Sequence, residues 1–515
     1  MRLGRTRRAA VIGALVFPLV LSGCSLGPSG GGVDASDEER NPTGNPDPAK
    51  DLNVKLPAGF DLAKGWSVDE TQRVFVAAQS GGLLLDIFAV GNSAEQALDE
   101  AASATPTGDE ETPSESPSPS AEESSGAGPS SVLIARDAAD GHVVWSSTPL
   151  RRIVAERPPL LRVAQTDQGL YAVVVRTGGL PANGVARARQ LVVIDSFPLV
   201  GAGTERAPAR HVEHMVDGSP DDVDTLVGEG GVLITGFAER DEAPATVLWD
   251  PLTGVLSTLP PGPTRPMPGC SSEFRCEIQE QPLFPTGAGM LFREDTENSD
   301  LSESLRFGVS GRWNSAQVAP QGRAESTILA VTGTAVLAAW RAGEDQTPLY
   351  AVHDLLSGAI LASAECAGTT PDSTAVVEAL FDTERDAVDL DTAAQVSSNG
   401  RYLVSDFFAA DLSGRTATCF TGDRENRSVS FLSVDDRGVG YATLRDDDND
   451  TPDVAVVQTR TKRVDALPVG TSAPIAITST GSGVFSIEDE DGSSDRGPGV
   501  VVAPPGQGTP APAQP

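Results

Sequence analysis

The chain has 515 residues and a formal net charge of −34, from 72 acidic against 38 basic residues. This length permits several small domains or one large β domain with a well-filled core. The acidic excess argues against nucleic acid and anionic lipid headgroups as partners, because both bind basic surfaces. Solubility explains the excess, and a bound cation or a cationic partner is the alternative.

The N-terminus carries the strongest local signal. Arginines at four of the first eight positions precede the apolar run Ala9–Leu21, which is too short to span a bilayer as a helix. The run ends in Leu21, Ser22, Gly23 and Cys24, which resembles the lipobox of a bacterial (actinobacterial-type) lipoprotein signal. The resemblance implies that residues 1–23 are a signal peptide. Cys24 would then carry a diacylglyceryl group and fatty acyl chains such as palmitate, which anchor the protein stably to the cell membrane on its extracytoplasmic face. An ordinary secretory signal with a chance cysteine is the alternative.

Composition divides the rest of the chain. Residues 24–53 are rich in Gly, Ser, Pro and Asp and predict a flexible tether. Residues 54–505 predict the folded domain, and 506–515 a disordered Pro-rich tail. Within the domain, 91–130 consist mainly of Glu, Ser, Pro, Thr and Ala and predict a disordered insertion in one loop. A linker between two domains is the alternative for this stretch.

Strand–turn–strand units recur through the domain. In the unit Val247–Leu259, strand-forming residues lead into Asp250, whose carboxylate can bind nearby backbone N–H groups, and Gly254 can adopt φ > 0 where the turn closes. Similar units recur about every 45 to 60 residues, and another apolar strand precedes each one. Each period therefore predicts about four short strands and no helix.

Repeated four-stranded sheets favour an all-β fold, a β-propeller, because radial packing leaves only short protected strand edges. The last period, 474–505, is one strand short, and the early strand around 60–68 can complete it and close the ring. This count favours eight blades, with seven as the rival. An array of β-sandwiches is the structural alternative, although it calls for repeats nearer 100 residues.

One repeat matches a known motif in full. Ala135, Asp137, Gly141 and Trp145 have the spacing Ala-x-Asp-x-x-x-Gly-x-x-x-Trp, which resembles the tryptophan-docking motif of pyrroloquinoline-quinone (PQQ) quinoproteins. In this motif Asp holds the turn, Gly permits it and Trp wedges between adjacent blades. The pairs Asp250/Gly254 and Asp354/Gly358 match in part, and Asp411/Gly414 is one residue short. The resemblance implies a PQQ-like repeat domain, and many such domains carry no quinone.

Four cysteines remain besides Cys24, and an even number in an exported protein predicts two disulfides with three possible connectivities. We favour Cys270–Cys276, which closes a short loop and leaves Cys366–Cys419. The latter two lie on the return strands of consecutive repeats, so their bond would link neighbouring blades. A zinc site is the alternative, but the chain has no C-x-x-C motif.

No motif assigns a catalytic residue, a metal or a cofactor. A PQQ enzyme of the resembled family would need a Trp over the quinone, Ca²⁺ and an Asp base. The acidic run 446–450, with Asp446, Asp448 and Asp450, is a weak Ca²⁺ candidate, because it lacks the glutamate of an EF-hand. The acidic run 488–492 is similar, and His211 and His214 lack a third metal ligand nearby.

These observations predict a membrane-anchored, extracytoplasmic propeller lipoprotein that is not an enzyme. It would act as a binding or scaffold module and hold an envelope protein or a small ligand on its propeller face, without nucleic acid. One alternative is a PQQ- or metal-dependent dehydrogenase or another propeller enzyme. The other is an extracytoplasmic ligand sensor.

Overall fold

A computed structural model describes the structure in separate stretches: 46–49, 52, 54–68, 73–80, 82–90, 130–150, 154–155, 159–166, 168–180, 189–216, 224–237, 245–260, 262–266, 277–296, 306–343, 346–367, 394–422, 427–445, 453–487 and 499–506. They all belong to one compact unit, residues 42–515. Eight sheets of four or five strands make up this unit. Within the described stretches, helix is limited to Ala49, a 3₁₀ turn at Leu62–Lys64 and the short α2 (Ser315–Val318).

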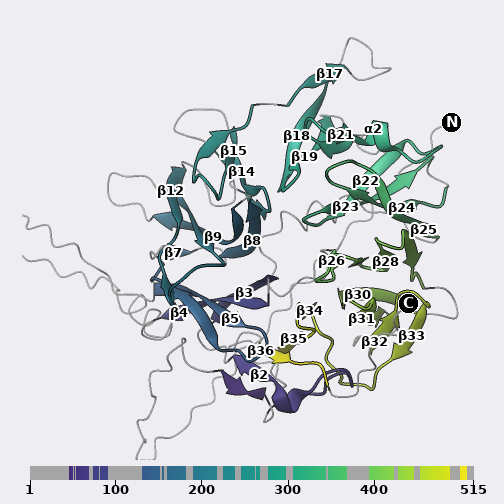
Figure 1. The fold of residues 1–515 in the computed structure, drawn as a ribbon. Coiled ribbons are helices and arrows are strands. Elements are labelled where there is room, and N and C mark those ends of the chain that lie inside the picture. Colours follow the sequence, from purple (N-terminus) through teal and green to yellow (C-terminus); the bar gives the residue numbers. More distant parts are fainter. Residues whose placement is uncertain are drawn as a thin grey trace, which may run out of the picture. The chain divides into compact units, whose positions relative to one another are not determined.

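The fold is an eight-bladed β-propeller of four-stranded blades (Figure 1). The first three blades follow chain order. Blade 1 contains β3 (Arg73–Ser80), β4 (Leu83–Val90), β5 (Ser130–Asp137) and β6 (Val143–Ser147), with β11 (Glu205–Arg206) added at its edge. Blade 2 contains β8 (Leu160–Thr166), β9 (Gly169–Leu180), β10 (Arg189–Pro198) and β12 (Arg210–Val216), and β7 (Val154–Ala155) also pairs with β9. Blade 3 contains β13 (Asp224–Gly228), β14 (Gly231–Phe237), β15 (Ala245–Trp249) and β16 (Leu256–Thr258).

The next four blades repeat the same up-and-down order. Blade 4 contains β18 (Glu277–Thr286), β19 (Gly289–Thr296), β20 (Phe307–Val309) and β21 (Trp313–Asn314), with β17 (Thr264–Pro266) paired to β18. Blade 5 contains β22 (Glu325–Val331), β23 (Ala335–Arg341), β24 (Leu349–Asp354) and β25 (Ile360–Glu365). Blade 6 contains β26 (Gln395–Val396), β27 (Tyr402–Ser405), β28 (Phe408–Asp411) and β29 (Thr416–Cys419). Blade 7 contains β30 (Ser428–Val434), β31 (Val439–Arg445), β32 (Asp453–Gln458) and β33 (Arg463–Ala466).

Blade 8 joins the two ends of the domain. It contains β34 (Ala476–Ile477), β35 (Gly483–Ile487) and β36 (Gly499–Ala503) from the C-terminal end, and β2 (Trp66–Val68) and β1 (Asp47–Pro48) from the N-terminal end. Trp66 lies opposite Val502 in the antiparallel β2–β36 pair. The predicted closure by an early strand, and with it the count of eight blades rather than seven, is confirmed.

Blade 8 also begins earlier in the chain than composition indicated. Asp47 and Pro48 pair with Ser67 and Trp66, and Ala49 is fully buried beside Phe485. These residues lie within the stretch 24–53 to which the sequence assigned a tether. In blade 1, Val90 lies opposite Ser130, so residues 91–129 connect two adjacent strands of one sheet.

The core lies between the blades. Buried apolar clusters join blades 1 and 2, 2 and 3, 4 and 5, 5 and 6, 6 and 7, and 8 and 1. The backbone N–H of Gly230 reaches Pro285 O between blades 3 and 4, and Ser433 Oγ donates to Pro474 O between blades 7 and 8. At the junctions with such a cluster, one blade covers the face of the next, which explains why the strands there are nearly continuous apolar runs.

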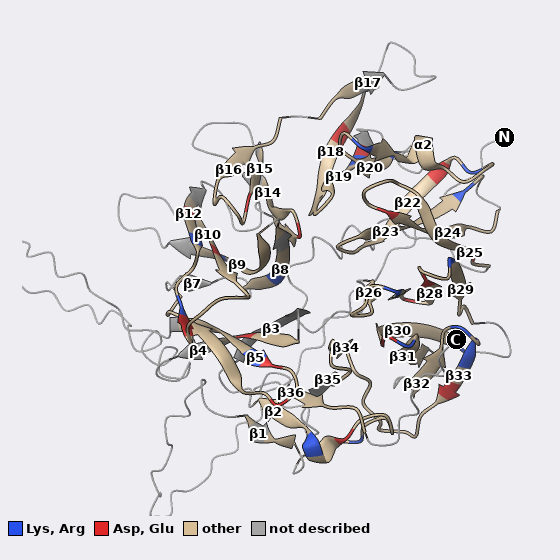
Figure 2. Ribbon diagram, viewed as in Figure 1, with Lys and Arg blue, Asp and Glu red and all other residues tan. Residues whose placement is uncertain are grey.

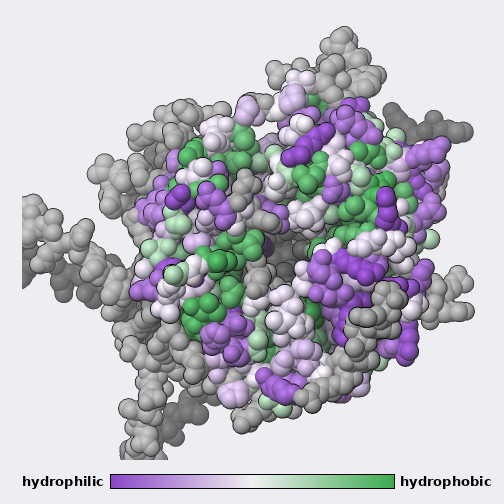
Figure 3. All heavy atoms as spheres, in the orientation of Figure 1, coloured by the Kyte–Doolittle hydropathy of each residue, from purple (hydrophilic) through white to green (hydrophobic). Residues whose placement is uncertain are grey.

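Acidic and basic residues are both scattered along the strands and turns of the described blades (Figure 2). In the same orientation, hydrophobic residues form separate patches with hydrophilic residues between them (Figure 3). No helix within the described part of the chain is long and apolar enough to cross a membrane.

Candidate functional site

The repeated Asp-to-Gly turns act locally. Asp250 Oδ1 accepts from the backbone N–H of Leu252 at 2.8 Å, and Asp137 and Asp354 accept in the same way from residues two or three positions on. Gly141, Gly254 and Gly358 have φ of 76°, 72° and 71°, a region that suits glycine. These residues hold hairpin turns at the ends of the third strands.

The turn after Asp411 is one residue shorter, and a residue other than glycine takes its left-handed position. Asp411 Oδ1 accepts from Gly414 N at 2.8 Å, and the left-handed position falls on Arg415, with φ of 55°. In the full motif, Trp145 is completely buried opposite Ala135 and stacks on Phe197 of blade 2 at 6.2 Å. The motif residues thus pack blade 1 against blade 2.

All five tryptophans lie in packing positions. Trp66, Trp145, Trp249, Trp313 and Trp340 are each at most 5% exposed and belong to the inter-blade clusters. A quinone that stacks on an indole face therefore finds no exposed tryptophan in this chain.

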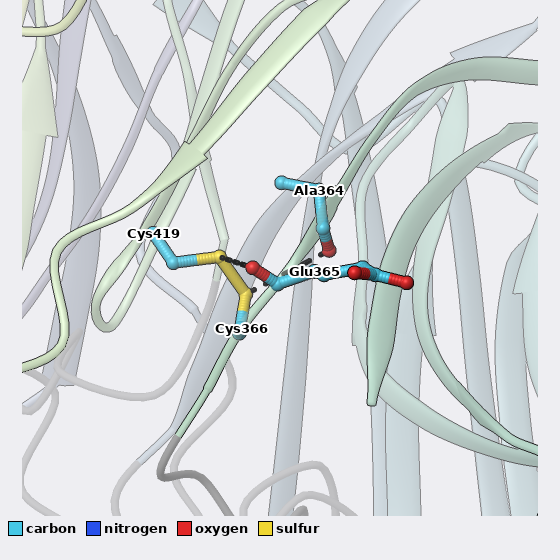
Figure 4. Close-up of a disulfide and its surroundings, with 4 residues drawn as sticks. All are labelled: Ala364, Glu365, Cys366 and Cys419. Carbon is cyan, nitrogen blue, oxygen red and sulfur yellow. Dashed lines mark hydrogen bonds between the residues drawn. A yellow bond between two sulfur atoms is a disulfide. The ribbon is translucent and has the colours of Figure 1, made fainter. Parts of the chain in front are cut away.

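Cys366 and Cys419 form a disulfide between consecutive blades, as their positions in the repeats predicted (Figure 4). Cys366 follows β25 of blade 5 and Cys419 ends β29 of blade 6. The predicted partner bond Cys270–Cys276 lies outside the described residues. So do the lipobox residues Leu21, Ser22, Gly23 and Cys24, and the Ca²⁺ candidates Asp446, Asp448 and Asp450.

The two histidines of the H-x-x-H pattern do not converge. They lie on β12, where an odd spacing places side chains on opposite faces of the strand. His211 instead contacts Asp195 at 2.6 Å and Glu213 at 3.1 Å. Asp195 is buried and also pairs with Arg176 at 2.7 Å. In the described stretches no group of three or more His, Cys, Asp or Glu side chains could hold a metal ion.

A pocket lies where the ring closes. It has a volume of about 270 Å³ and opens between the first hairpin turns of blades 7 and 8. The N-terminal segment and the end of β36 complete it. Its lining comprises Gly59, Phe60, Asp435, Asp436, Arg437, Tyr441, Ile477, Thr478, Ser479, Thr480, Gly481 and Pro505. We call this the seam pocket.

Blade 7 supplies the charged wall of the seam pocket. Asp435 is 7% exposed and accepts from Arg437 Nε at 2.7 Å and from Arg437 Nη2 at 2.6 Å. It also caps its own turn by accepting from the backbone N–H of Arg437 and of Val439. Asp436 faces blade 6, where Ser398 Oγ donates to it at 2.7 Å and Asn399 N at 2.9 Å. Both carboxylates are thus held in place by neighbours.

Aromatic rings and hydroxyl groups form the other walls. The Tyr441 ring is 5.5 Å from Phe60, which in turn packs edge-on against Phe485. Burial, together with the nearby Asp435 charge, raises the pKa of Tyr441 to about 12, so the phenol stays protonated. From blade 8, Thr478, Thr480 and Ser482 form a chain of hydroxyl contacts at 2.8 and 3.1 Å, and Ser479 is exposed at the rim.

Sequence reasoning missed this pocket. Part of the signal was present, because a Ser, Thr or Asp side chain at the end of an inner strand caps the following hairpin in several blades. These residues are Thr166, Thr286, Thr332, Ser397, Asp435 and Thr478. The pattern locates the first hairpin turns, and two of these turns border the pocket.

No protein-family model matches this chain, and no curated protein matches it. Among solved structures, it is similar to the β-propeller domain of the Trilobed protease from Pyrococcus furiosus, with 8% identity and a TM-score of 0.33 over 85% of this chain and 94% of that one. It is also similar to a putative 6-phosphogluconolactonase from Bacteroides fragilis, with 10% identity and a TM-score of 0.17 over 67% and 92%. The fold assigned above depends on the strand pairing within this chain.

Proposed function

We propose that this protein is a membrane-anchored propeller lipoprotein that acts as a non-catalytic binding module on the extracytoplasmic face of the cell membrane. Cys24 carries the anchor, and the seam pocket is the binding site. One observation supports binding rather than catalysis. The charged groups of the pocket are engaged with each other or with neighbouring turns, and its phenol stays protonated, so these groups orient a ligand rather than exchange protons.

Two features of the pocket support this assignment further. It is concave and combines two aromatic rings, Phe60 and Tyr441, with polar side chains, and small-molecule sites likewise combine apolar surface with placed polar groups. It also joins both ends of the domain, so the binding site exists only when blade 8 is assembled. A ligand held there stabilises the closed ring by mass action.

The anchor is tested by labelling cells with radioactive palmitate. Wild-type protein should be labelled and sediment with membranes, whereas Cys24→Ala should lose the label and leave the membrane fraction. Protease added to intact spheroplasts should degrade the wild-type protein. Label that persists in Cys24→Ala, or protection from protease, would contradict the anchored, extracytoplasmic arrangement.

The binding site is tested by placing a photo-reactive amino acid at Thr480, which is exposed at the pocket rim, and in a control at Thr258, which is exposed on the outer strand β16 of blade 3. Illumination of living cells should yield a discrete adduct from position 480 and none from position 258. Equal patterns from both positions would refute the seam pocket as the binding site.

A further inference from the structure

The hydroxyl group of Tyr441 is the most informative atom of the seam pocket. The side chain is only 4% exposed, and its Oη has no hydrogen-bond partner among the described residues. A Cβ built on Gly59 would lie 3.6 Å from Oη, so the hydroxyl faces the open space beside the N-terminal segment. Oη is not among the solvent-inaccessible polar atoms of the described residues, so water reaches it, and a ligand oxygen can displace that water and take over its hydrogen bond.

Further hydrogen-bonding capacity surrounds this hydroxyl. Arg437 uses Nε and Nη2 to bind Asp435, and Nη1 makes no hydrogen bond to any described residue. Asp436 receives two hydrogen bonds, which leaves part of the acceptor capacity of a carboxylate unused. Ser479 adds an exposed hydroxyl at the rim. The pocket therefore presents both donors and acceptors to one ligand.

The charges of the seam pocket offer an ionic ligand little gain in binding energy. Asp435 and Arg437 neutralise each other in a two-point contact, and Asp436 adds one negative charge at the rim. The carboxylate of Asp436 would repel an anion, and a cation would gain only this one exposed carboxylate, whose attraction solvent screens and whose oxygens already accept hydrogen bonds. A ligand that both donates and accepts hydrogen bonds without carrying charge fits this arrangement.

The aromatic rings and the volume of the seam pocket restrict the class of ligand further. Phe60, Tyr441 and Pro505 supply apolar surface beside the polar groups, so the ligand has an apolar face as well as polar edges. The volume of about 270 Å³ is near the lower end of small-molecule pockets, which start at about 300 Å³. This volume is enough for a ligand of about one ring.

We propose that the seam pocket binds a single neutral sugar ring, either free or at the end of a glycan. The hydroxyls of the sugar would bind Tyr441 Oη, Arg437 Nη1 and Asp436, and its C–H face would lie against Phe60. This inference rests on the proposed function, since it names the ligand class of the same site.

The experiment uses the full-length protein in a polyoxyethylene detergent that contains no sugar. Saturation-transfer NMR is recorded with glucose, N-acetylglucosamine and myo-inositol, and with the charged comparators glucuronate and glucosamine. We expect saturable binding of at least one neutral compound, at least tenfold tighter than either charged comparator. The proposal is overturned if no neutral compound binds saturably at ligand concentrations up to about 20 mM, 20-fold above a Kd of 1 mM. It is also overturned if a charged compound binds more tightly than every neutral one.

Two variants link the signal to the pocket. Tyr441→Phe keeps the ring and removes the hydroxyl, so it should weaken sugar binding about tenfold. Gly59→Ala places a methyl group in ordinary contact with Oη and should weaken binding without unfolding the domain. The matched control is Tyr350→Phe. It removes the hydroxyl of a tyrosine that is 3% exposed and lies in the core between blades 5 and 6. Unchanged affinity in both pocket variants would overturn the proposal.

The cross-linking experiment at Thr480 distinguishes failure of the sugar proposal from failure of the proposed function as a binding module. If Thr480 captures a cellular component but no neutral sugar binds, the sugar proposal fails and the binding module stands. If neither result appears, both fail.

Discussion

The indole Nε1 of Trp340 donates a hydrogen bond to Nε2 of His353 at 2.9 Å in the buried core between blades 4 and 5. Because Nε2 accepts, the proton of the neutral ring lies on Nδ1, which donates to the carbonyl of Gly358 at 2.9 Å. His353 thus joins a core tryptophan to the turn that ends β24. Burial lowers the pKa of His353, since a charged imidazole would lose its solvation there.

The pKa values of His142, His211 and His353 should therefore differ from one another. His353 should take up its proton at a lower pH than a free histidine, whereas the pKa of His142 is raised by its hydrogen bond to Asp140. Burial is the largest single influence on His211 and lowers its pKa, but the contacts with Asp195 and Glu213 together outweigh burial and the net shift is upward. Proton–nitrogen correlation spectra between pH 5 and 8 would resolve the rings. A His353 ring that titrates together with His142 would contradict this assignment.

The same shift predicts how acid affects stability. The unfolded chain binds a proton at His353 near pH 6.5 and the folded protein does not, so stability from this group is present above pH 6.5 and is lost as pH falls toward the folded-state pKa. In His353→Gln this acid-dependent loss should disappear. Urea unfolding at pH 7.5, 6.5 and 5.5 measures the free energy of unfolding of both proteins. If this free energy falls equally with pH in the wild type and in His353→Gln, His353 is not the source of the loss.

The disulfide should stabilise blades 5 and 6. Cys366 and Cys419 are 53 residues apart, and a bond that closes such a loop contributes about 4 kcal/mol at most in the chain-entropy estimate, with 2–4 kcal/mol typical. The double variant Cys366→Ser/Cys419→Ser should therefore unfold at lower urea without reductant. The variant leaves Cys270 and Cys276 unchanged, so the difference reports only this bond. An unchanged unfolding midpoint would contradict the predicted contribution.

Local chemistry made much of the propeller predictable. Asp250 and Gly254 act within one turn, so a sequence pattern of five residues contains the whole cause of that turn. Strand β23 is buried along almost its full length, so its sequence is a continuous apolar run that predicts a buried strand. Even the closure of blade 8 followed from a missing strand at one end and an unassigned strand at the other.

The seam pocket could not be predicted in this way. Phe60, Arg437 and Ser479 are brought together only when the first and last strands of the ring pair, and no local pattern encodes that meeting. The pairing of Asp47 with Ser67 has the same origin, because Asp47 lies in a polar stretch whose composition resembles a linker. Long-range closure, rather than propensity, fixes both features.

A buried ion pair in blade 2 offers a further test. Arg176 and Asp195 have side chains that are 8% and 3% exposed. Arg176→Met would leave the Asp195 carboxylate buried with only His211 as a charge partner among the described residues, which costs about 3–5 kcal/mol. The control is Arg463→Met, which breaks the exposed pair with Asp465 and should change stability by less than about 1 kcal/mol. Urea unfolding compares the two. Similar losses would show that burial of Asp195 does not determine the cost.

The junction between blades 8 and 1 depends on a glycine. Gly141 has φ of 76°, and a Cβ there would lie 2.5 Å from both Pro46 Cγ and Trp66 Cδ2. Gly311 occupies the equivalent turn of blade 4 with φ of 72°, and a Cβ there would have no neighbour within 4 Å. Gly311→Ala therefore measures the backbone strain alone, about 1 kcal/mol.

Gly141→Ala should add the cost of displacing Trp66, about 1–3 kcal/mol more, because the indole is fixed against Val502 in the closing strand pair and cannot move without disturbing it. Urea unfolding measures both losses, and tryptophan fluorescence of the folded state reports whether the Trp66 environment changes. If the two variants lose the same stability, the packing of Trp66 on Gly141 does not hold the ring closed, and closure depends on the β2–β36 pairing alone.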